Sequence, residues 1–111
     1  MSKELTIKDN RDFQRLYKRG KSFVGPTVVT YVIKNNKNNI RYGITTGKKI
    51  GNAVRRSRAR RVIRAAFREI APEIKGGCDI VFVARGKTPY VKSTVVKKEM
   101  YRHFSQAGLI E

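Results

Sequence analysis

The chain has 111 residues, 40% of them hydrophobic, and a formal net charge of +18 at pH 7. This length predicts a single domain over residues 1–111, and the hydrophobic fraction argues against a disordered basic tail. The apolar runs span only a few residues, far short of the ~20 needed to cross a bilayer, so we expect no membrane partner.

The first element predicted is a helix near the N-terminus. Residues 1–6 before it lack the apolar stretch of a secretory signal. The helix is capped by Asp9 or Asn10 and runs to Arg19. Gly20 is placed to end it in the left-handed conformation.

Three short β signals follow this helix. Residues 21–24 are a candidate edge strand. Residues 28–33 are rich in β-branched side chains, and residues 35–39 form a polar turn. Residues 40–46 should therefore return across this turn and pair with the preceding strand as a hairpin.

The central helix is the most basic element of the chain. It is predicted from Asn52 or Ala53 to Ile70, and Pro72 stops it. Its buried stripe, at 3.6-residue spacing, consists of Ala59, Val62, Ile63, Ala66, Phe67 and Ile70. Beside that stripe an arginine recurs every four residues, at Arg56, Arg60, Arg64 and Arg68.

The last two elements are a strand and a helix. Residues 79–84 are almost continuously apolar, which is the pattern of a central strand. The lone Cys78 beside them is expected to be buried, and a single cysteine fits a reducing cytoplasm. A helix over residues 93–107 ends at Gly108. The order αβββαβα predicts an α+β fold with helices packed on one mixed sheet.

The charge distribution indicates a polyanionic partner. From Phe13 to Arg68 there are 56 residues with 16 Lys and Arg and no Asp or Glu. A charge run is usually a solvated face, but nine basic residues between positions 48 and 68 have no acid among them. Such crowding destabilises a compact chain, and arginine binds phosphate oxygens bidentately. We therefore predict a nucleic-acid surface.

Signals for catalysis or metal binding are almost absent. The only histidine, His103, falls inside the last helix and is expected to pack there. The eight carboxylates are scattered, no Cys/His cluster could hold zinc, and residues 43–51 lack the order of a phosphate-binding loop. We predict no catalytic residue, no metal site and no cofactor bound by this chain alone.

Three aromatic residues allow two interpretations. Phe13 and Tyr17 share one face of the first helix with Leu16, at the spacing of a core face. Tyr31 lies on a strand. If the neighbouring sheet face is open, the three aromatics would instead form a stacking platform for unpaired bases.

Residues 48–61 carry the most specific motif of the chain. They read Lys-Lys-Ile-Gly-Asn-Ala-Val-x-Arg-x-Arg-x-x-Arg and resemble the signature of the bacterial ribonuclease P protein subunit. Two positions depart from the family's pattern: Ser57 stands where Asn is usual, and Arg60 where Lys is common. Supporting segments follow the family's order at residues 12–20, 41–44, 64–68, 79–85 and 107–109.

The resemblance implies both a fold and a function. The fold is αβββαβα with an unusual left-handed βαβ crossover around the basic helix. The function is that of a subunit of ribonuclease P, the endoribonuclease that removes the 5′ leader from precursor tRNA. In this family the catalytic RNA carries the chemistry with Mg²⁺. The protein binds that RNA and the leader, and we expect no obligate protein partner.

The family's binding residues transfer to this chain position by position. The leader cleft would use Phe13, Tyr17 and Tyr31, with Arg64 and Arg68 at its border. The surface for the RNA subunit would consist of Lys48, Lys49, Asn52, Arg56, Arg58, Arg60, Arg61 and Arg64.

Two other classes of protein share some of these features. A non-catalytic structural RNA-binding protein, such as a small ribosomal protein, fits the composition and the basic helix, but it does not explain an open aromatic cleft. A DNA-binding protein that places the arginine helix in a major groove is the weaker alternative. A preference for precursor over mature tRNA would distinguish all three.

Overall fold

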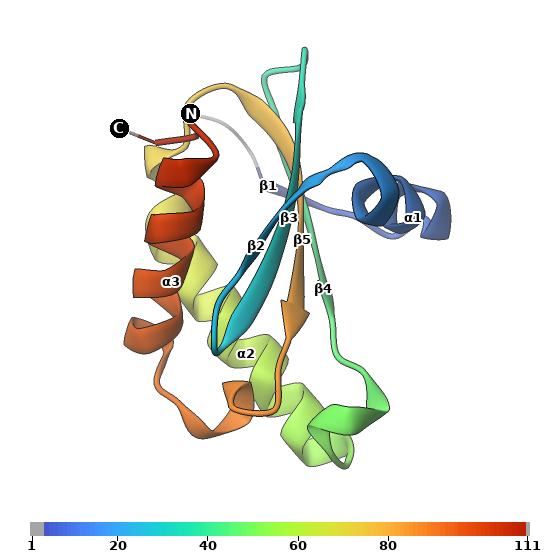
Figure 1. Ribbon diagram of the computed structural model, residues 1–111, viewed down its shortest axis with the longest axis vertical. Coiled ribbons are helices and arrows are strands. Elements are labelled where there is room, and N and C mark those ends of the chain that lie inside the picture. The colour runs from blue at the N-terminus through green and yellow to red at the C-terminus, as the bar shows by residue number, and fades with distance from the viewer. Residues whose placement is uncertain (1–3, 111) are drawn as a thin grey trace.

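The structure, a computed structural model, describes residues 4–110 and consists of one five-stranded sheet with helices on both faces (Figure 1). The strands are β1 (Glu4–Thr6), β2 (Lys21–Val24), β3 (Val28–Asn35), β4 (Ile40–Thr45) and β5 (Gly77–Ala84). The α-helices are α1 (Asn10–Arg19), α2 (Ala53–Ile70) and α3 (Ser93–Gln106). Three single-turn 3-10 helices are η1 (Lys48–Ile50), η2 (Ala71–Glu73) and η3 (Thr88–Tyr90).

The α+β class and the predicted element order are confirmed, with one addition. The sheet is mixed and has the order β1-β4-β5-β3-β2; helix α1 lies on one face, and α2 and α3 cover the other (Figure 1). The added strand is β1, which pairs in parallel with β4 from Glu4↔Ile40 to Thr6↔Tyr42. The sequence did not indicate it because three residues are too short to show a period-2 pattern.

The predicted hairpin of residues 28–33 with 40–46 is wrong. Strands β3 and β4 do not pair, because β5 lies between them, antiparallel to β3 and parallel to β4. Seven of the eight residues of β5 are buried. A strand that is apolar on both faces is stabilised most at the centre of a sheet, where both neighbours shield it from water.

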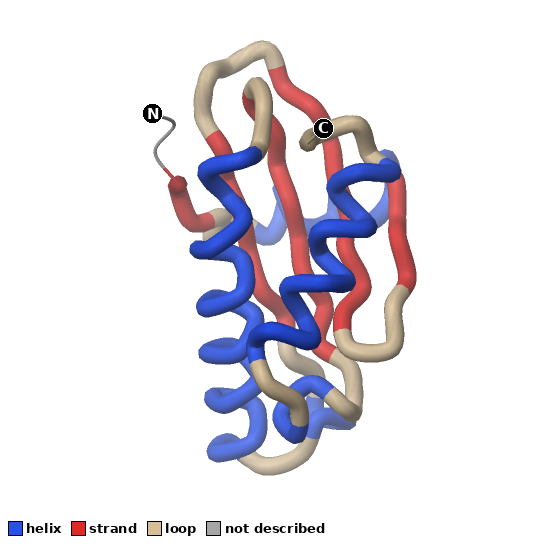
Figure 2. The backbone as a smooth tube through the Cα atoms, turned by 90° about the vertical axis from the view of Figure 1, so that its left-hand side faces the viewer, coloured by secondary structure: helices blue, strands red, loops and turns tan. Residues whose placement is uncertain are grey.

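The connection from β4 through α2 to β5 is a left-handed crossover. Figure 2 looks onto the face covered by α2 and α3, with β1 at the left; β4 and β5 both run downward, and β5 lies to the right of β4. Crossovers between parallel strands are right-handed in about 98% of cases. The handedness implied by the family resemblance is therefore present in this chain.

The main core lies between the sheet and the two helices α2 and α3. Phe67 of α2 contacts Phe82 of β5 and Phe104 of α3, with ring centroids 5.2 and 6.2 Å apart. The predicted stripe of α2 is buried, except that Val62 is only half-buried. Cys78 is buried as predicted, and burial raises the pKa of its thiol to about 12. The thiol therefore stays protonated at neutral pH.

Two glycines end helices, but only one does so as predicted. Gly108 closes α3 at φ +75, in the left-handed region that favours glycine. Gly20, by contrast, is extended, with φ −73 and ψ 154, because β2 begins at the next residue. A Cβ at Gly20 would lie 2.5 Å from the Leu16 carbonyl oxygen. Glycine is therefore required there by close packing and not by a positive φ.

Candidate RNA-binding surfaces

The aromatic residues singled out in the sequence lie together on the α1 face of the sheet. The register aligns Tyr31 of β3 with Val81 of β5 and Gly43 of β4, so these three share one row of that face. Helix α1 places Tyr17 against Tyr31, with ring centroids 5.1 Å apart and an interplanar angle of 78°. Phe13 reaches Gly43, where an added Cβ would lie 2.7 Å from its ring.

These three aromatics, Phe13, Tyr17 and Tyr31, form what we call the aromatic trio. All three are half-buried and pack against a small second core formed by Ile7, Leu16 and Val81. The tyrosine hydroxyl of Tyr17 points to Thr45 Oγ1 at 3.4 Å. The rings are thus anchored from below by apolar contacts and keep part of their surface exposed. Stacking of unpaired bases needs this combination.

The sheet face beside the aromatic trio is only partly covered. Helix α1 lies across the upper part of that face in Figure 1. The next row of the sheet, two residues along each strand, joins Val24, Val29, Val83 and Thr45. Val29, Val83 and Thr45 are half-buried, and Val24 is exposed. An apolar surface therefore continues from the trio down the sheet.

A buried carboxylate fixes α1 to this face. Asp79 is 2% exposed and accepts hydrogen bonds from Arg41 Nε at 3.0 Å and Nη2 at 2.6 Å. It also accepts from Arg15 Nη2 of α1 at 2.8 Å and from Asn35 Nδ2 at 3.1 Å. Arg41 Nη1 reaches Asp12 of α1 at 3.3 Å. Two arginines and two aspartates thus connect α1 to β4 and β5.

The charge state of Asp79 follows from this network. Burial by itself raises the pKa of Asp79, but the hydrogen bonds and the charge of Arg41 outweigh it and hold the pKa below its usual value. The same hydrogen bond raises the pKa of Arg41. Sequence reasoning did not assign these residues a role. The available signal was an acidic residue opening an apolar buried strand, because a buried carboxylate needs a cationic partner.

The basic surface is formed by η1 and α2. Residues that bind phosphate groups must be exposed. Five of the predicted residues meet this requirement: Lys48, Lys49, Arg58, Arg60 and Arg61. Within the described part of the chain, no arginine of α2 forms an ion pair with a carboxylate.

Three other members of the predicted surface have constraints of their own. Asn52 caps α2, since its Oδ1 accepts a hydrogen bond from the Arg55 backbone N–H at 3.0 Å. Half-buried Arg56 donates from Nη1 to the Gly51 carbonyl at 3.2 Å. Arg64 is also half-buried. The side-chain oxygen of Asn52 is therefore already engaged in capping the helix.

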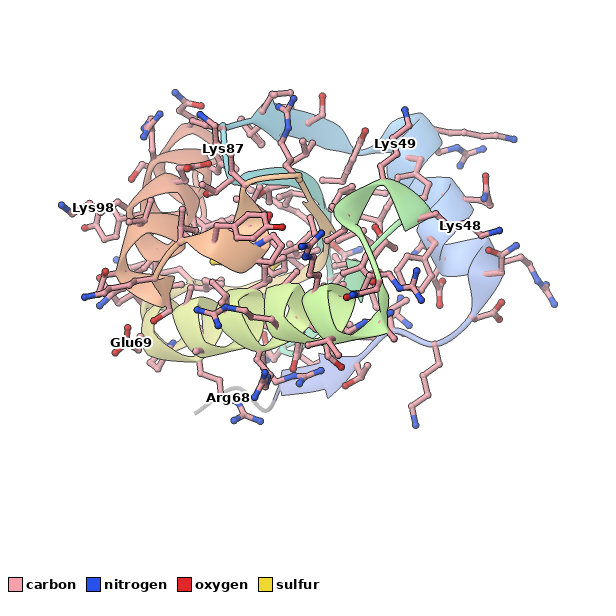
Figure 3. All side chains as sticks on the ribbon, turned by 90° about the horizontal axis from the view of Figure 1, so that it is seen from below. Lys48, Lys49, Arg68, Glu69, Lys87 and Lys98 are labelled. Atoms are coloured by element: carbon pink, nitrogen blue, oxygen red, sulfur yellow. The ribbon has the colours of Figure 1, made fainter. Side chains whose placement is uncertain are left out.

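The predicted RNA-binding residues do not form one continuous patch. Lys48 and Lys49 project on the same side of the sheet as α1, whereas Arg68 projects from the outer side of α2 (Figure 3). Arg64 and Arg68 belong to α2, on the opposite sheet face from the aromatic trio. The two faces meet at the edge of β4, which β1 covers only as far as Tyr42. RNA contacting both sets would pass around this edge.

No catalytic constellation is evident among the side chains that the structure describes, which begin at Thr6. No group of three or more His, Cys, Asp and Glu side chains could hold a metal ion there. His103 is buried and its Nδ1 lies 2.8 Å from Thr30 Oγ1, so it packs between α3 and the sheet, as expected. Burial lowers the pKa of His103. No helix in this part of the chain is long and apolar enough to cross a membrane.

Comparison with known proteins identifies the family. The protein-family model described as Ribonuclease P matches residues 1–108. The chain belongs to the ribonuclease P protein family. It is 38% identical, over 112 residues, to the ribonuclease P protein component of Oceanobacillus iheyensis, and the match covers 100% of this chain and 93% of that protein.

Solved structures of ribonuclease P proteins have the same fold. The RNase P protein of Staphylococcus aureus superposes with a TM-score of 0.82 and 32% identity, covering 98% of this chain and 100% of that one. The protein of Thermotoga maritima superposes with a TM-score of 0.79 and 30% identity, covering 91% and 96%.

The family membership decides between the alternatives left open by the sequence. Ribonuclease P proteins act in tRNA 5′ maturation as the protein component of a ribonucleoprotein enzyme. This chain is therefore a subunit of the ribonuclease P holoenzyme and has an RNA partner. This membership explains the basic helix, so the chain need not be interpreted as a small ribosomal protein or as a DNA-binding protein.

Proposed function

We propose that this ribonuclease P protein binds two different RNAs with two surfaces. The basic surface of η1 and α2 binds the catalytic RNA subunit, and the aromatic trio binds the single-stranded 5′ leader of precursor tRNA. The observation that carries the proposal is the edge-on pair of Tyr17 and Tyr31, half-buried and 5.1 Å apart on a partly open sheet face. Aromatic side chains held in this way provide faces for unpaired bases.

The electrostatics support the assignment of the RNA subunit to the basic surface. The exposed arginines Arg58, Arg60 and Arg61 have no carboxylate partner among the described residues. Each is free to bind phosphate oxygens with two parallel N–H donors. Counterion release from the RNA then provides much of the affinity and makes it depend on salt.

We expect the RNA subunit, with its Mg²⁺, to carry out the cleavage. Two carboxylates on the same sheet face as the aromatic trio support this, since Asp12 and Asp79 are both paired with Arg15 and Arg41. His103 of α3 is buried against the opposite face of the sheet, at Thr30. The role of this chain would be to position the leader. The lone buried Cys78 is compatible with action in the cytoplasm.

Reconstitution tests both parts of the proposal. The protein is combined with a bacterial ribonuclease P RNA at low Mg²⁺, and 5′ leader cleavage is measured with and without it. We expect cleavage to be stimulated and precursor tRNA to be bound more tightly than mature tRNA. Equal affinity for the two tRNAs, with no stimulation of cleavage, would overturn the proposal.

A further inference from the structure

An exposed tyrosine stands beside the start of the basic helix. Tyr90 of η3 is 64% exposed, and the guanidinium carbon of Arg55 lies 5.7 Å from the centroid of its ring. Val54, one residue before Arg55, is 73% exposed. Neither Tyr90 nor Arg55 is among the residues that the family resemblance assigns to the RNA subunit or to the leader.

The turn that carries Tyr90 is firmly anchored. Thr88 is buried; its Oγ1 donates to the Thr27 carbonyl at 2.6 Å and accepts from the Arg85 backbone N–H at 2.8 Å. Pro89, the next residue, is buried as well. The exposed ring of Tyr90 is thus held on a fixed turn and takes no part in the core. A ring held in this way is available for contact with a partner.

The ring borders a hollow with positively charged walls. A depression of about 360 Å³ lies between α2 and η3, lined by Val54, Arg55, Arg58, Pro89 and Tyr90. A second one of about 510 Å³ begins at Arg58 and continues along α2 to Arg61, with Lys92 on its far side. Figures 1 and 3 show the η3 turn beside the first half of α2. No carboxylate lines either depression.

We propose that Tyr90 is a stacking site for an unpaired nucleotide of the RNA subunit. The base stacks on the exposed ring, while Arg55 and Arg58 contact the phosphates on either side of it. Rings and arginines in one positively charged groove match a nucleotide, because they provide a π-face together with bidentate phosphate donors. This site rests on the proposed function and extends the basic surface across the groove from α2 to η3.

Charge argues for RNA and against a protein on this surface. A protein partner would need acidic groups opposite Arg55, Arg58, Arg61 and Lys92, together with a larger apolar area than Val54 and Tyr90 offer. The family already places an RNA in contact with this chain. The groove opens directly beside the helix that carries the family's arginine motif.

Substitution at two exposed tyrosines tests the site. Tyr101 of α3 is 41% exposed and lines neither depression, so Y101A is the matched control for Y90A. With a bacterial ribonuclease P RNA as the probe, we expect Y90A to bind about tenfold more weakly with an unchanged salt dependence, since no charge is lost. Y90F should bind like the parent, and R55Q should reduce both affinity and the salt slope.

Fluorescence gives a second, direct readout. The chain contains no tryptophan, so the Y90W variant carries a single indole at the proposed site. Adding the RNA should quench and shift its emission if a base stacks there, and Y101W should respond weakly or not at all. Melting temperatures close to that of the parent show that the variants remain folded.

Two results would overturn the site. If Y90A binds the RNA as tightly as the parent, no base stacks on this ring, while the proposed function stands. If Y90A also changes the sedimentation of the protein while RNA binding stays normal, the surface serves a contact with another protein molecule instead. Failure of the parent protein itself to bind ribonuclease P RNA would instead refute the proposed function.

Discussion

The ring of Tyr17 stands edge-on to the ring of Tyr31, with centroids 5.1 Å apart and planes at 78°. The two residues are on different elements, α1 and β3, so the position of α1 on the sheet determines their contact. That position is set by the ion pairs that Arg15 and Asp12 make with the sheet at Asp79 and Arg41.

Truncation of the two tyrosines of the aromatic trio should affect leader binding more than stability. We expect Y17A and Y31A to bind the RNA subunit normally and to lose about 1–3 kcal/mol of binding to substrates with a 5′ leader. Y42A is the control, because Tyr42 is buried against Phe67 and its loss should cost about 3–5 kcal/mol of stability. Binding of precursor and mature tRNA and thermal melting are the measurements. A large drop in melting temperature with leader affinity intact would place Tyr17 and Tyr31 in the core.

Adding a methyl group at Gly43, which packs against the Phe13 ring, should disturb the aromatic trio. In G43A the new Cβ would lie 2.7 Å from the Phe13 ring, so the ring or α1 must move. We expect a lower preference for precursor tRNA and a modest loss of stability. G47A provides the control, because a Cβ added at Gly47 would have no heavy atom within 4 Å and the φ of this residue is negative. Equal effects of the two substitutions would show that the Phe13–Gly43 contact is unimportant.

The arginine motif should determine the salt dependence of RNA-subunit binding. R58A and R61A should each weaken binding by about 1–3 kcal/mol and lower the slope of log K against log salt by about one. The control is K98A, since Lys98 is an exposed residue of α3 on the far side from α1 (Figure 3). Affinities measured over a series of salt concentrations give both quantities. If K98A and R58A behave alike, the effect is one of net charge and not of the motif.

The buried carboxylate should make the protein sensitive to acid. The pKa of Asp79 is lowered in the folded state from an ordinary value of 3.8, so its ion pairs stabilise the fold above that value. This contribution is lost as the pH falls through the folded-state pKa, that is, below about 4. D79N should cost about 3 kcal/mol at neutral pH, because it removes the buried negative charge that pairs with Arg15 and Arg41.

Denaturant unfolding at several pH values measures this effect. The free energy of unfolding of the parent should fall more steeply below pH 4 than that of D79N. Burial also lowers the pKa of His103, so the fold loses stability when this side chain is protonated in acid. That loss begins at a higher pH than the loss from Asp79, as the pH falls below the ordinary histidine value of 6.5. D12N is the matched control, because Asp12 is more exposed and makes longer contacts. Parallel curves for D79N and the parent would contradict the role of Asp79.

Local patterns were sufficient to predict the helices. The helix starts, near Asp9 or Asn10 and near Asn52 or Ala53, and the stop at Gly108 were predicted because start and stop signals involve residues close in sequence. The stripe of α2 was predicted because a periodicity of 3.6 identifies a buried face without reference to its partner. The conformation of Gly20 was missed because it depends on where the chain goes next.

The sequence by itself determined the helices, the central position of β5, the basic surface and, through the motif at residues 48–61, the family. The tertiary structure alone decided that β5 separates β3 from β4, because strand pairing is a competition between distant segments. It also decided that Tyr31 meets Tyr17, that Asp79 anchors α1 and that Tyr90 stands beside Arg55. These contacts join residues 14, 64 and 35 positions apart. Periodicity and capping cannot register such contacts, because both act within a few residues along the chain.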